Sequence, residues 1–124
     1  MQRIALILFI GCFFSFVSHV QGQAKLPGAK SAGAAKIHNQ YCAKCHGERG
    51  KGDGPTTKTL KKMKMTDWTN KPIMAKFTDD DLFKIVSEGG KAVGKSNLMP
   101  GFKAKLKEKD IRGQVTYIRS FSQK

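Results

Sequence analysis

The sequence Cys42-Ala43-Lys44-Cys45-His46 decides how this chain folds and what it can bind. In a helix, the spacing of the two cysteines sets their thiols about one turn apart, and the histidine follows the second thiol directly. Two cysteines at this spacing can form a redox-active disulfide, supply half of a zinc site or attach a cofactor covalently. The rest of the chain decides between these three uses.

The disulfide and zinc interpretations both lack support elsewhere in the chain. A thioredoxin-like pair requires alternating strands and helices, which the sequence does not show. A zinc site needs about four ligands, and beyond the motif residues 23–124 offer only His38 as a further histidine or cysteine. Cys-X-X-Cys-His is the attachment signature of c-type haem. We therefore predict one haem c, bound covalently through Cys42 and Cys45, with His46 as an iron ligand.

The first 22 residues have the pattern of a secretory signal peptide. Arg3 gives a positive start, an apolar run of fourteen residues extends from Ile4 to Val17, and small or modest side chains precede a cut after Gly22. The apolar run is shorter than the roughly 20 residues of a spanning helix. An uncleaved anchor and a lipid on Cys12 are the alternatives, and the apolar run continues past Cys12. We expect a periplasmic or otherwise exported protein without stable membrane insertion.

The chain is strongly basic, with 23 lysines and arginines, nine acidic residues and a net charge of +14. Removal of residues 1–22 leaves +13, because Arg3 is their only charged side chain. A surface of this charge attracts anionic partners. We expect one or more acidic redox proteins as partners and a monomer or weak homo-oligomer. Nucleic-acid binding is not expected, because the basic runs lack interleaved aromatic residues.

Residues 23–33 are rich in Gly, Ala, Ser and Lys and are predicted to form a flexible leader, with a single domain over residues 34–124. Ala34, Ile37 and Tyr41 recur at helical spacing, so a helix should run from Ala34 into the cysteine pair. A glycine-rich loop is expected over residues 47–57. A short helical turn at residues 60–63 and a loop through Trp68 and Pro72 should follow.

The second half of the chain predicts two further helices. Thr78 and Asp81 form the pattern of a capping box, and Gly89-Gly90 marks the end of that helix. After a long loop over residues 91–105, apolar residues recur at helical spacing between Leu106 and Phe121. Nothing indicates paired strands, and the fold class is all-α.

The second axial ligand of the iron has several candidates, namely Met63, Met65, Met74, Met99 and His38. Most methionines in small proteins fill gaps in the core. Met99 differs because Pro100 and Gly101 follow it in a loop between two helices, where the backbone is stiffened. His38 lies four residues before Cys42 on the same helix, from which it cannot easily reach the other face of the haem. These observations favour Met99, and His38 is expected to be a partly buried or surface helix residue.

The segment Asn97-Leu98-Met99-Pro100-Gly101-Phe102, together with the attachment motif, resembles the class I monohaem cytochromes c. The resemblance covers residues 34–121 and implies a small helical bundle around one haem, with the terminal helices crossing. It also implies that His46 and Met99 bind the iron axially. The family's glycine and aromatic residue at the helix crossing correspond here to Ala34 and His38, which weakens the aromatic contact.

Two further residues are assigned by the same resemblance. Gly52-Asp53-Gly54-Pro55 is similar to a family segment in which a proline carbonyl accepts a hydrogen bond from the ligand histidine, which implies this role for Pro55. Asp67-Trp68-Thr69 looks like the segment near the haem propionates. This implies one of two roles for Trp68: its indole N–H donates to a propionate, or its side chain anchors the loop.

Ligation by His46 and Met99 would leave the iron without an open position and favour the ferrous state. We therefore expect an electron carrier and not an enzyme: a periplasmic protein that shuttles single electrons between redox partners. The alternative is a small haem subunit bound permanently to an oxidase or dehydrogenase complex. The haem is expected to lie among Leu60, Trp68, Ile85, Leu98 and Phe102, and its exposed edge to be ringed by Lys44, Lys51, Lys95 and Lys103.

Overall fold

The computed structural model describes residues 28–60 and 63–123. The predicted signal peptide and the start of the leader lie outside these ranges. The described elements are α1 (Gly28–Ile37), the π-helical turn η1 (His38–Cys42), α2 (Ala43–His46), α3 (Pro55–Thr59), α4 (Lys71–Met74), α5 (Asp79–Glu88), the 3₁₀ turn η2 (Lys91–Val93) and α6 (Glu108–Ser122). Over the described ranges there is one isolated β-bridge, between Gly89 and Pro100, and no strand. The all-α prediction is confirmed.

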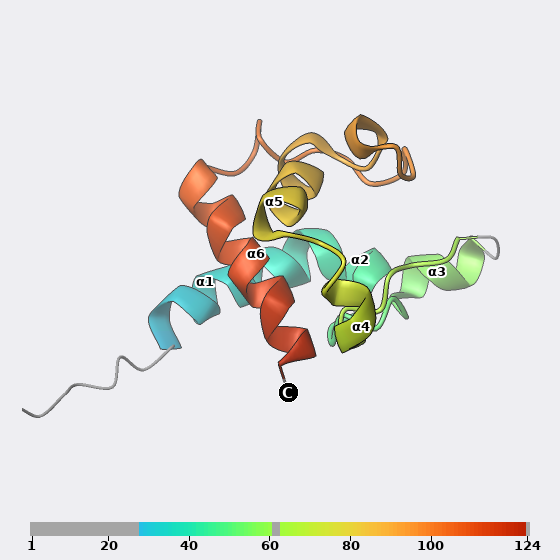
Figure 1. Cartoon of the computed structure of the whole chain (residues 1–124), viewed down its shortest axis with the longest axis horizontal. Coiled ribbons are helices and arrows are strands. Elements are labelled where there is room, and N and C mark those ends of the chain that lie inside the picture. The colour runs from blue at the N-terminus through green and yellow to red at the C-terminus, as the bar shows by residue number, and fades with distance from the viewer. Residues whose placement is uncertain (1–27, 61–62, 124) are drawn as a thin grey trace, which may run out of the picture.

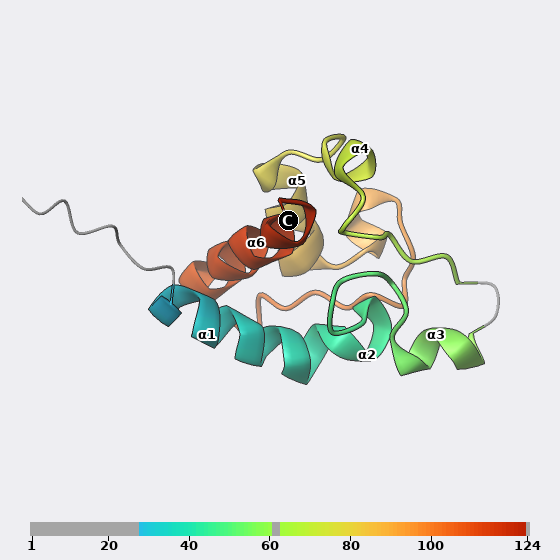
Figure 2. The ribbon, with the colours of Figure 1, turned by 90° about the horizontal axis from the view of Figure 1, so that it is seen from below.

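The first and last helices cross, and the rest of the chain packs around that crossing (Figures 1 and 2). Figure 2 shows α1, η1 and α2 as one continuous rod. Helix α6 contacts α1 on one side and α4 and α5 elsewhere along its length. The crossing of terminal helices implied by the family resemblance is therefore present.

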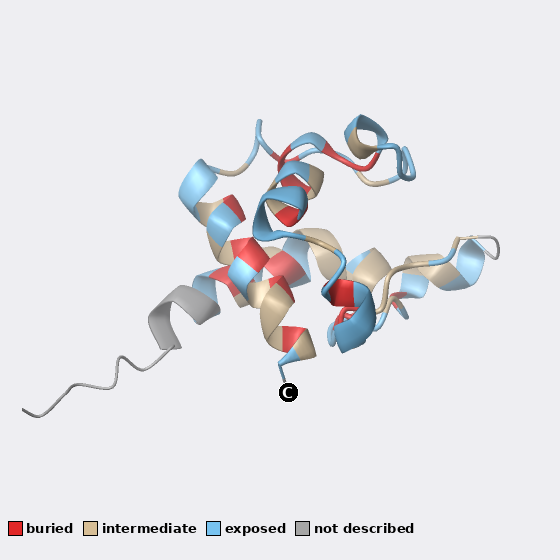
Figure 3. Ribbon diagram, in the orientation of Figure 1, coloured by how far each residue is buried: buried red, intermediate tan, exposed pale blue. Residues whose placement is uncertain are grey.

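The core forms where α6, α5 and the segments between them meet (Figure 3). Helix α6 buries one stripe of residues at three- and four-residue steps, as its sequence predicted: Ile111, Val115, Ile118 and Phe121. The same core includes Trp68, Met74, Leu82, Val86 and Phe102. Full burial of each such aliphatic side chain contributes roughly 1.5–3 kcal/mol, so this stripe is a main source of stability for the fold.

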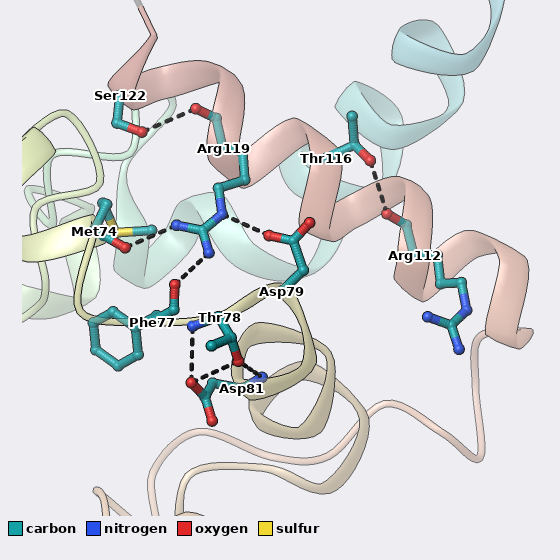
Figure 4. A network of polar contacts seen from close by, with 9 residues as sticks. All are labelled: Met74, Phe77, Thr78, Asp79, Asp81, Arg112, Thr116, Arg119 and Ser122. Atoms are coloured by element: carbon teal, nitrogen blue, oxygen red, sulfur yellow. Dashed lines mark hydrogen bonds and ion pairs between the residues drawn. The ribbon is translucent and has the colours of Figure 1, made fainter.

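The predicted capping box at the start of α5 is present (Figure 4). The Asp81 backbone N–H donates to Thr78 Oγ1 at 3.1 Å, and Asp81 Oδ2 accepts from the Thr78 backbone N–H at 2.8 Å. This backbone hydrogen bond is the main reason that the pKa of Asp81 is lowered, and the Thr78 hydroxyl adds to it. The helix begins where its sequence predicted.

Arg119 joins α6 to the connection between α4 and α5 (Figure 4). Its guanidinium donates to the carbonyl oxygens of Met74, at 2.8 Å, and of Phe77, and to Asp79 Oδ1, at 2.8 Å. The planar fork of arginine suits three acceptors that come from different directions. The side chain therefore holds the α4–α5 connection against α6.

Helix α1 begins at Gly28 and not at Ala34, so residues 28–33 of the predicted leader are helical. Alanine and lysine have high helix propensity, and α1 is further stabilised by its contacts with α6. The prediction treated this composition as a linker because it lacks apolar periodicity.

Two short helices lie where loops were predicted. Helix α3 starts at Pro55, whose fixed φ suits the first helical position. Helix α4 is capped by the side chain of Asn70, which accepts from the Ile73 backbone N–H at 3.1 Å, and has Pro72 in its first turn. Helix α6 begins at Glu108, two residues later than predicted. The start of α4 comes from local capping by Asn70, which apolar periodicity does not reveal.

Candidate haem-binding site

The attachment motif lies at the end of the rod formed by α1, η1 and α2. Cys42 closes the π-helical turn, in which the Ala43 N–H donates to the His38 carbonyl, and His46 is the last residue of α2. Both cysteines are half-buried and not joined in a disulfide. Burial, and to a lesser extent Cys45, raises the pKa of the Cys42 thiol to about 11. The motif therefore holds no disulfide, and its two cysteines are available for covalent attachment.

The imidazole of His46 is held against the indole of Trp68. The two rings are stacked, with centroids 4.2 Å apart and planes 22° from parallel. Burial, and to a lesser extent nearby His38, lowers the pKa of His46 to about 4. The ring is therefore neutral near pH 7, which is the form of imidazole that binds a metal.

Trp68 is only 6% exposed, and it also contacts the rings of His38 and Phe121, at centroid distances of 5.8 and 5.9 Å. This buried position favours the interpretation of Trp68 as an anchor of its loop. It also reveals a contact that the sequence did not predict, because the indole covers one face of the proposed ligand histidine.

Pro55 is exposed at the first position of α3. Within residues 28–60 and 63–123, His46 Nδ1 is buried and has no hydrogen-bond partner. The bond from His46 to the Pro55 carbonyl that the resemblance implies is therefore not formed in this structure. The loop returns to α2 through its neighbour instead, since the Gly54 N–H donates to the Cys45 carbonyl at 3.2 Å.

Met99 is half-buried in the segment that follows α5 and η2. Its carbonyl accepts from the Gly90 N–H at 3.0 Å, and the Phe102 N–H donates to the Val86 carbonyl at 3.0 Å. Gly89 has φ +89°, and a Cβ there would lie 2.7 Å from the Met99 carbonyl oxygen. Main-chain contacts to the end of α5 thus fix the course of the Met99 segment.

The segment carrying Met99 is also tied to the attachment helix. The rings of Tyr41, which precedes Cys42, and Phe102, which closes the Met99 segment, lie with centroids 5.7 Å apart. Of the other candidate ligands, Met74 is 1% exposed within the core, whereas Met63 and Met65 are half-buried. Met74 is therefore a core residue, and Met99 stays the predicted ligand.

His38 is completely buried, contrary to the expectation of a partly buried or surface residue. It packs among Trp68, Tyr117 and Phe121, at the helix crossing, and its Nε2 is 2.9 Å from the Gly47 carbonyl oxygen. Burial lowers the pKa of His38, partly offset by the hydrogen bond to Gly47. The imidazole thus fills the aromatic position of the family, and the predicted weakening of this contact is wrong.

The chemistry of these side chains fits a covalent haem. Two cysteines that form no disulfide and a neutral imidazole lie in one short segment. Leu60 and Leu98, which are 39% and 58% exposed, offer apolar side chains for a flat ring. Two other predicted lining residues, Trp68 and Phe102, are already buried in the core. Ile85 instead lines a cavity of about 260 Å³ with Phe77 and Val93, in which neither the motif cysteines nor Met99 take part.

The described part of the chain supports neither a zinc site nor a membrane-spanning helix. Over residues 28–60 and 63–123 no three histidine, cysteine or acidic side chains gather as metal ligands. Over the same residues no helix has the length and apolar character needed to cross a bilayer.

Comparisons with known proteins agree with this site. Residues 29–118 match the cytochrome CBB3 family, which is described as cytochrome c oxidase, cbb3-type, subunit III. The chain is 30% identical to cytochrome c6 of Anabaena variabilis over 90 residues, which are 73% of this chain and 90% of the relative. The solved structure of the KustC0563 c-type cytochrome has the same fold, with a TM-score of 0.55 at 23% identity, over 71% of this chain and 95% of the other.

The helix crossing, the attachment motif and the matched family all lead to the same conclusion. The chain belongs to the cytochrome c family as a class I monohaem c-type cytochrome, an electron-transfer protein with one haem c bound covalently through Cys42 and Cys45.

Proposed function

We propose that this cytochrome is an exported, periplasmic carrier that shuttles single electrons between redox partners, with His46 and Met99 as the two axial ligands of the iron. The observation that carries the proposal is the fixed course of the Met99 segment. Backbone hydrogen bonds at the Met99 carbonyl, from Gly90, and at the Phe102 N–H hold it against the end of α5. A ligand on such a segment stays in place in both oxidation states.

Haem supplies one-electron redox chemistry in this fold, and a methionine sulfur favours the ferrous state. The residues of the chain provide the rest. Trp68 covers one face of His46, and the Tyr41–Phe102 contact ties the two ligand-bearing segments together. With both axial positions filled, no substrate can reach the iron, and we propose that the protein has no enzymatic activity.

The proposed partner is an acidic protein that docks near the attachment motif. Lys44 and Lys51 are exposed next to that motif. Of the other two lysines predicted to ring the haem edge, Lys103 pairs with Glu88 at 3.5 Å and Lys95 lies 4.9 Å from the ring centroid of Phe77. Lys44 and Lys51 are therefore the best placed to meet a partner's carboxylates.

The axial ligation is tested by the optical spectrum of the ferric protein. The wild-type protein should show the weak long-wavelength band of a methionine–iron(III) bond, and Met99→Ala should lose it. Met63→Leu and Met65→Leu are matched controls that should keep the band. A wild-type protein that lacks the band and binds carbon monoxide readily when reduced would contradict the carrier proposal.

Covalent attachment has a separate test by mass. The mature chain should carry the mass of one haem through acid and organic extraction, and the double variant Cys42→Ala, Cys45→Ala should not. The proposed signal peptide predicts that the mature chain begins near residue 23, and the measured mass of the chain would also show this.

A second candidate function is a haem subunit held permanently on a respiratory oxidase. The description of the matched family, an oxidase subunit, favours it. The two candidates differ in salt dependence, because surface charge pairs are screened by salt. A carrier should elute as a monomer and lose turnover with its partner as ionic strength rises, most steeply when Lys44 and Lys51 are intact. Stoichiometric co-purification with a large complex in high salt would instead support the subunit.

A further inference from the structure

His38 makes one hydrogen bond from a completely buried position. Its Nε2 lies 2.9 Å from the Gly47 carbonyl oxygen, which can only accept, so the proton must be on Nε2. Its Nδ1 is buried without a partner among the described residues and therefore carries a lone pair. The neutral ring thus has one defined tautomer and one polar contact.

That contact is made to the carbonyl of Gly47, the residue directly after His46. The Gly47 carbonyl also accepts from the Gly50 backbone N–H, at 3.1 Å. The Gly50 carbonyl accepts in turn from the backbone N–H of Trp68, at 2.7 Å. The indole of Trp68 then stacks on the imidazole of His46. His38, Gly47, Gly50 and Trp68 therefore form a closed chain of contacts around His46.

Gly50 shows how tightly this chain of contacts is packed. Its φ is +68°, and a Cβ there would lie 2.9 Å from Trp68 Cε3 and 3.1 Å from Phe121 Cδ2. Only glycine therefore fits at this point of the loop, against the rings of Trp68 and Phe121. The position of the Trp68 ring, and with it the face on which His46 rests, depends on the loop that His38 holds.

We propose that His38 is a positioning residue that fixes the plane of the His46 imidazole, acting through the Gly47 peptide and the Trp68 stack. The proposal rests on the proposed ligation of iron by His46. Metal-bound histidines are usually oriented by a hydrogen bond to their second ring nitrogen. In this structure the His46 ring is also packed on one face by Trp68, and the residue after it is anchored by His38.

The test separates the hydrogen bond of His38 from the space that its ring fills. His38→Phe keeps an aromatic ring but removes the donor, whereas the amide of His38→Gln can still donate to Gly47. In the ferric haem protein, the pattern of paramagnetically shifted haem methyl signals depends on the plane of the axial imidazole. We expect a changed pattern in His38→Phe and a pattern close to the wild type in His38→Gln.

A second measurement is the hydrogen exchange of the Gly50 amide, which shares the Gly47 carbonyl with His38. The Gly50 N–H donates to the same carbonyl as His38, so loss of the His38 bond should loosen the turn. We expect the Gly50 amide to exchange with solvent roughly fivefold to tenfold faster in His38→Phe, as befits the loss of one buried hydrogen bond. Unchanged exchange together with unchanged methyl signals would overturn the proposal and leave His38 as a space-filling residue.

Gln114 provides a matched control. It is also completely buried, on α6, and its side-chain amide has no hydrogen-bond partner within the described residues. Gln114→Leu changes a buried polar side chain without touching Gly47, and it should leave the methyl pattern as in the wild type. A change as large as that of His38→Phe would show that any alteration of the core moves His46, and would overturn the specific role of His38.

Nitrogen NMR of the wild-type protein keeps the proposal testable if His38→Phe does not fold. The His38 ring should show a slowly exchanging Nε2–H and an unprotonated Nδ1, and the reverse tautomer would overturn the proposal. The proposed function fails differently. If His46 is not a ligand, the wild-type haem lacks the spectrum of axial imidazole, whatever the variants show.

Discussion

The two segments that carry the proposed ligands are held by different means. The ring of His46 is held by side chains, with Trp68 stacked on it and the buried His38 bonded to the carbonyl of the next residue, Gly47. Met99 is held mainly by the backbone, through hydrogen bonds to Gly90 and between Phe102 and Val86. A change of side-chain volume should therefore weaken the first segment, and a change in backbone course should weaken the second.

The largest expected effect is the loss of the Trp68 side chain. Trp68→Ala removes a 6% exposed aromatic residue that touches both His46 and the core, and it should lower the free energy of unfolding by about 3–5 kcal/mol. Urea unfolding of the haem protein measures this loss. Ile73→Ala, at a 37% exposed position of nearby α4, is the control and should cost about 1 kcal/mol or less. Equal losses of stability in the two variants would show that the segment carrying His46 does not depend on packing by Trp68.

The segment carrying Met99 should lose stability when a substitution changes the course of the backbone that supports it. Gly89→Ala places a Cβ 2.7 Å from the Met99 carbonyl oxygen at a φ of +89°, and it should cost about 2–3 kcal/mol. On heating, the methionine–iron band should then disappear before helical circular dichroism does.

Gly94→Ala is a matched control for this substitution. Gly94 also has a positive φ, +68°, but a Cβ there would meet nothing within 4 Å. Only the backbone cost of about 1–2 kcal/mol applies, and the methionine–iron band should persist until the helices unfold. Early loss of the band in both variants would mean that η2, and not the contact at Gly89, controls Met99.

The features predicted correctly from sequence are those with a local signal. The attachment motif lies on a helix, Thr78 and Asp81 cap α5, and α6 buries Ile111, Val115 and Ile118. In each case the deciding residues lie within a few positions of one another. Short-range spacing is sufficient to read them.

The unexpected features depend on contacts between distant residues. His38 lies in a short stretch that is otherwise polar, and only α6, some 80 positions later in sequence, supplies the rings of Tyr117 and Phe121 that bury it. The stack of Trp68 on His46 likewise requires the loop from Gly47 to fold back. One sequence signal was available for His38: it occupies the position of the aromatic residue that the family places at its helix crossing.

A smaller effect is expected at Arg119, which holds the α4–α5 connection against α6. Arg119→Lys keeps the charge but cannot reach the carbonyls of Met74 and Phe77 and the carboxylate of Asp79 together, and it should cost about 1–3 kcal/mol. Arg112→Lys on the same helix alters an exposed pair with Glu108 and should cost no more than about 1 kcal/mol. Thermal unfolding compares the two. Similar losses of stability would mean that the three hydrogen bonds of Arg119 contribute no more than a surface ion pair.

The smallest effect is expected at the start of α5, far along that helix from the Met99 segment at its end. The pKa of Asp81 is lowered in the folded protein, chiefly by the Thr78 backbone N–H, so the unfolded chain takes up this proton more readily. The contribution of Asp81 to stability is therefore complete above the usual aspartate pKa of about 3.9 and is lost as the pH falls through the folded value. The stability difference between the wild type and Asp81→Asn should be constant above about pH 5 and shrink below about pH 4. The methionine–iron band should remain in Asp81→Asn at neutral pH, because fraying of the first turn of α5 leaves the carbonyls of its last turn in place to hold Phe102. Loss of the band in Asp81→Asn would show that α5 responds as a single unit, and that the backbone support of Met99 extends through the whole helix.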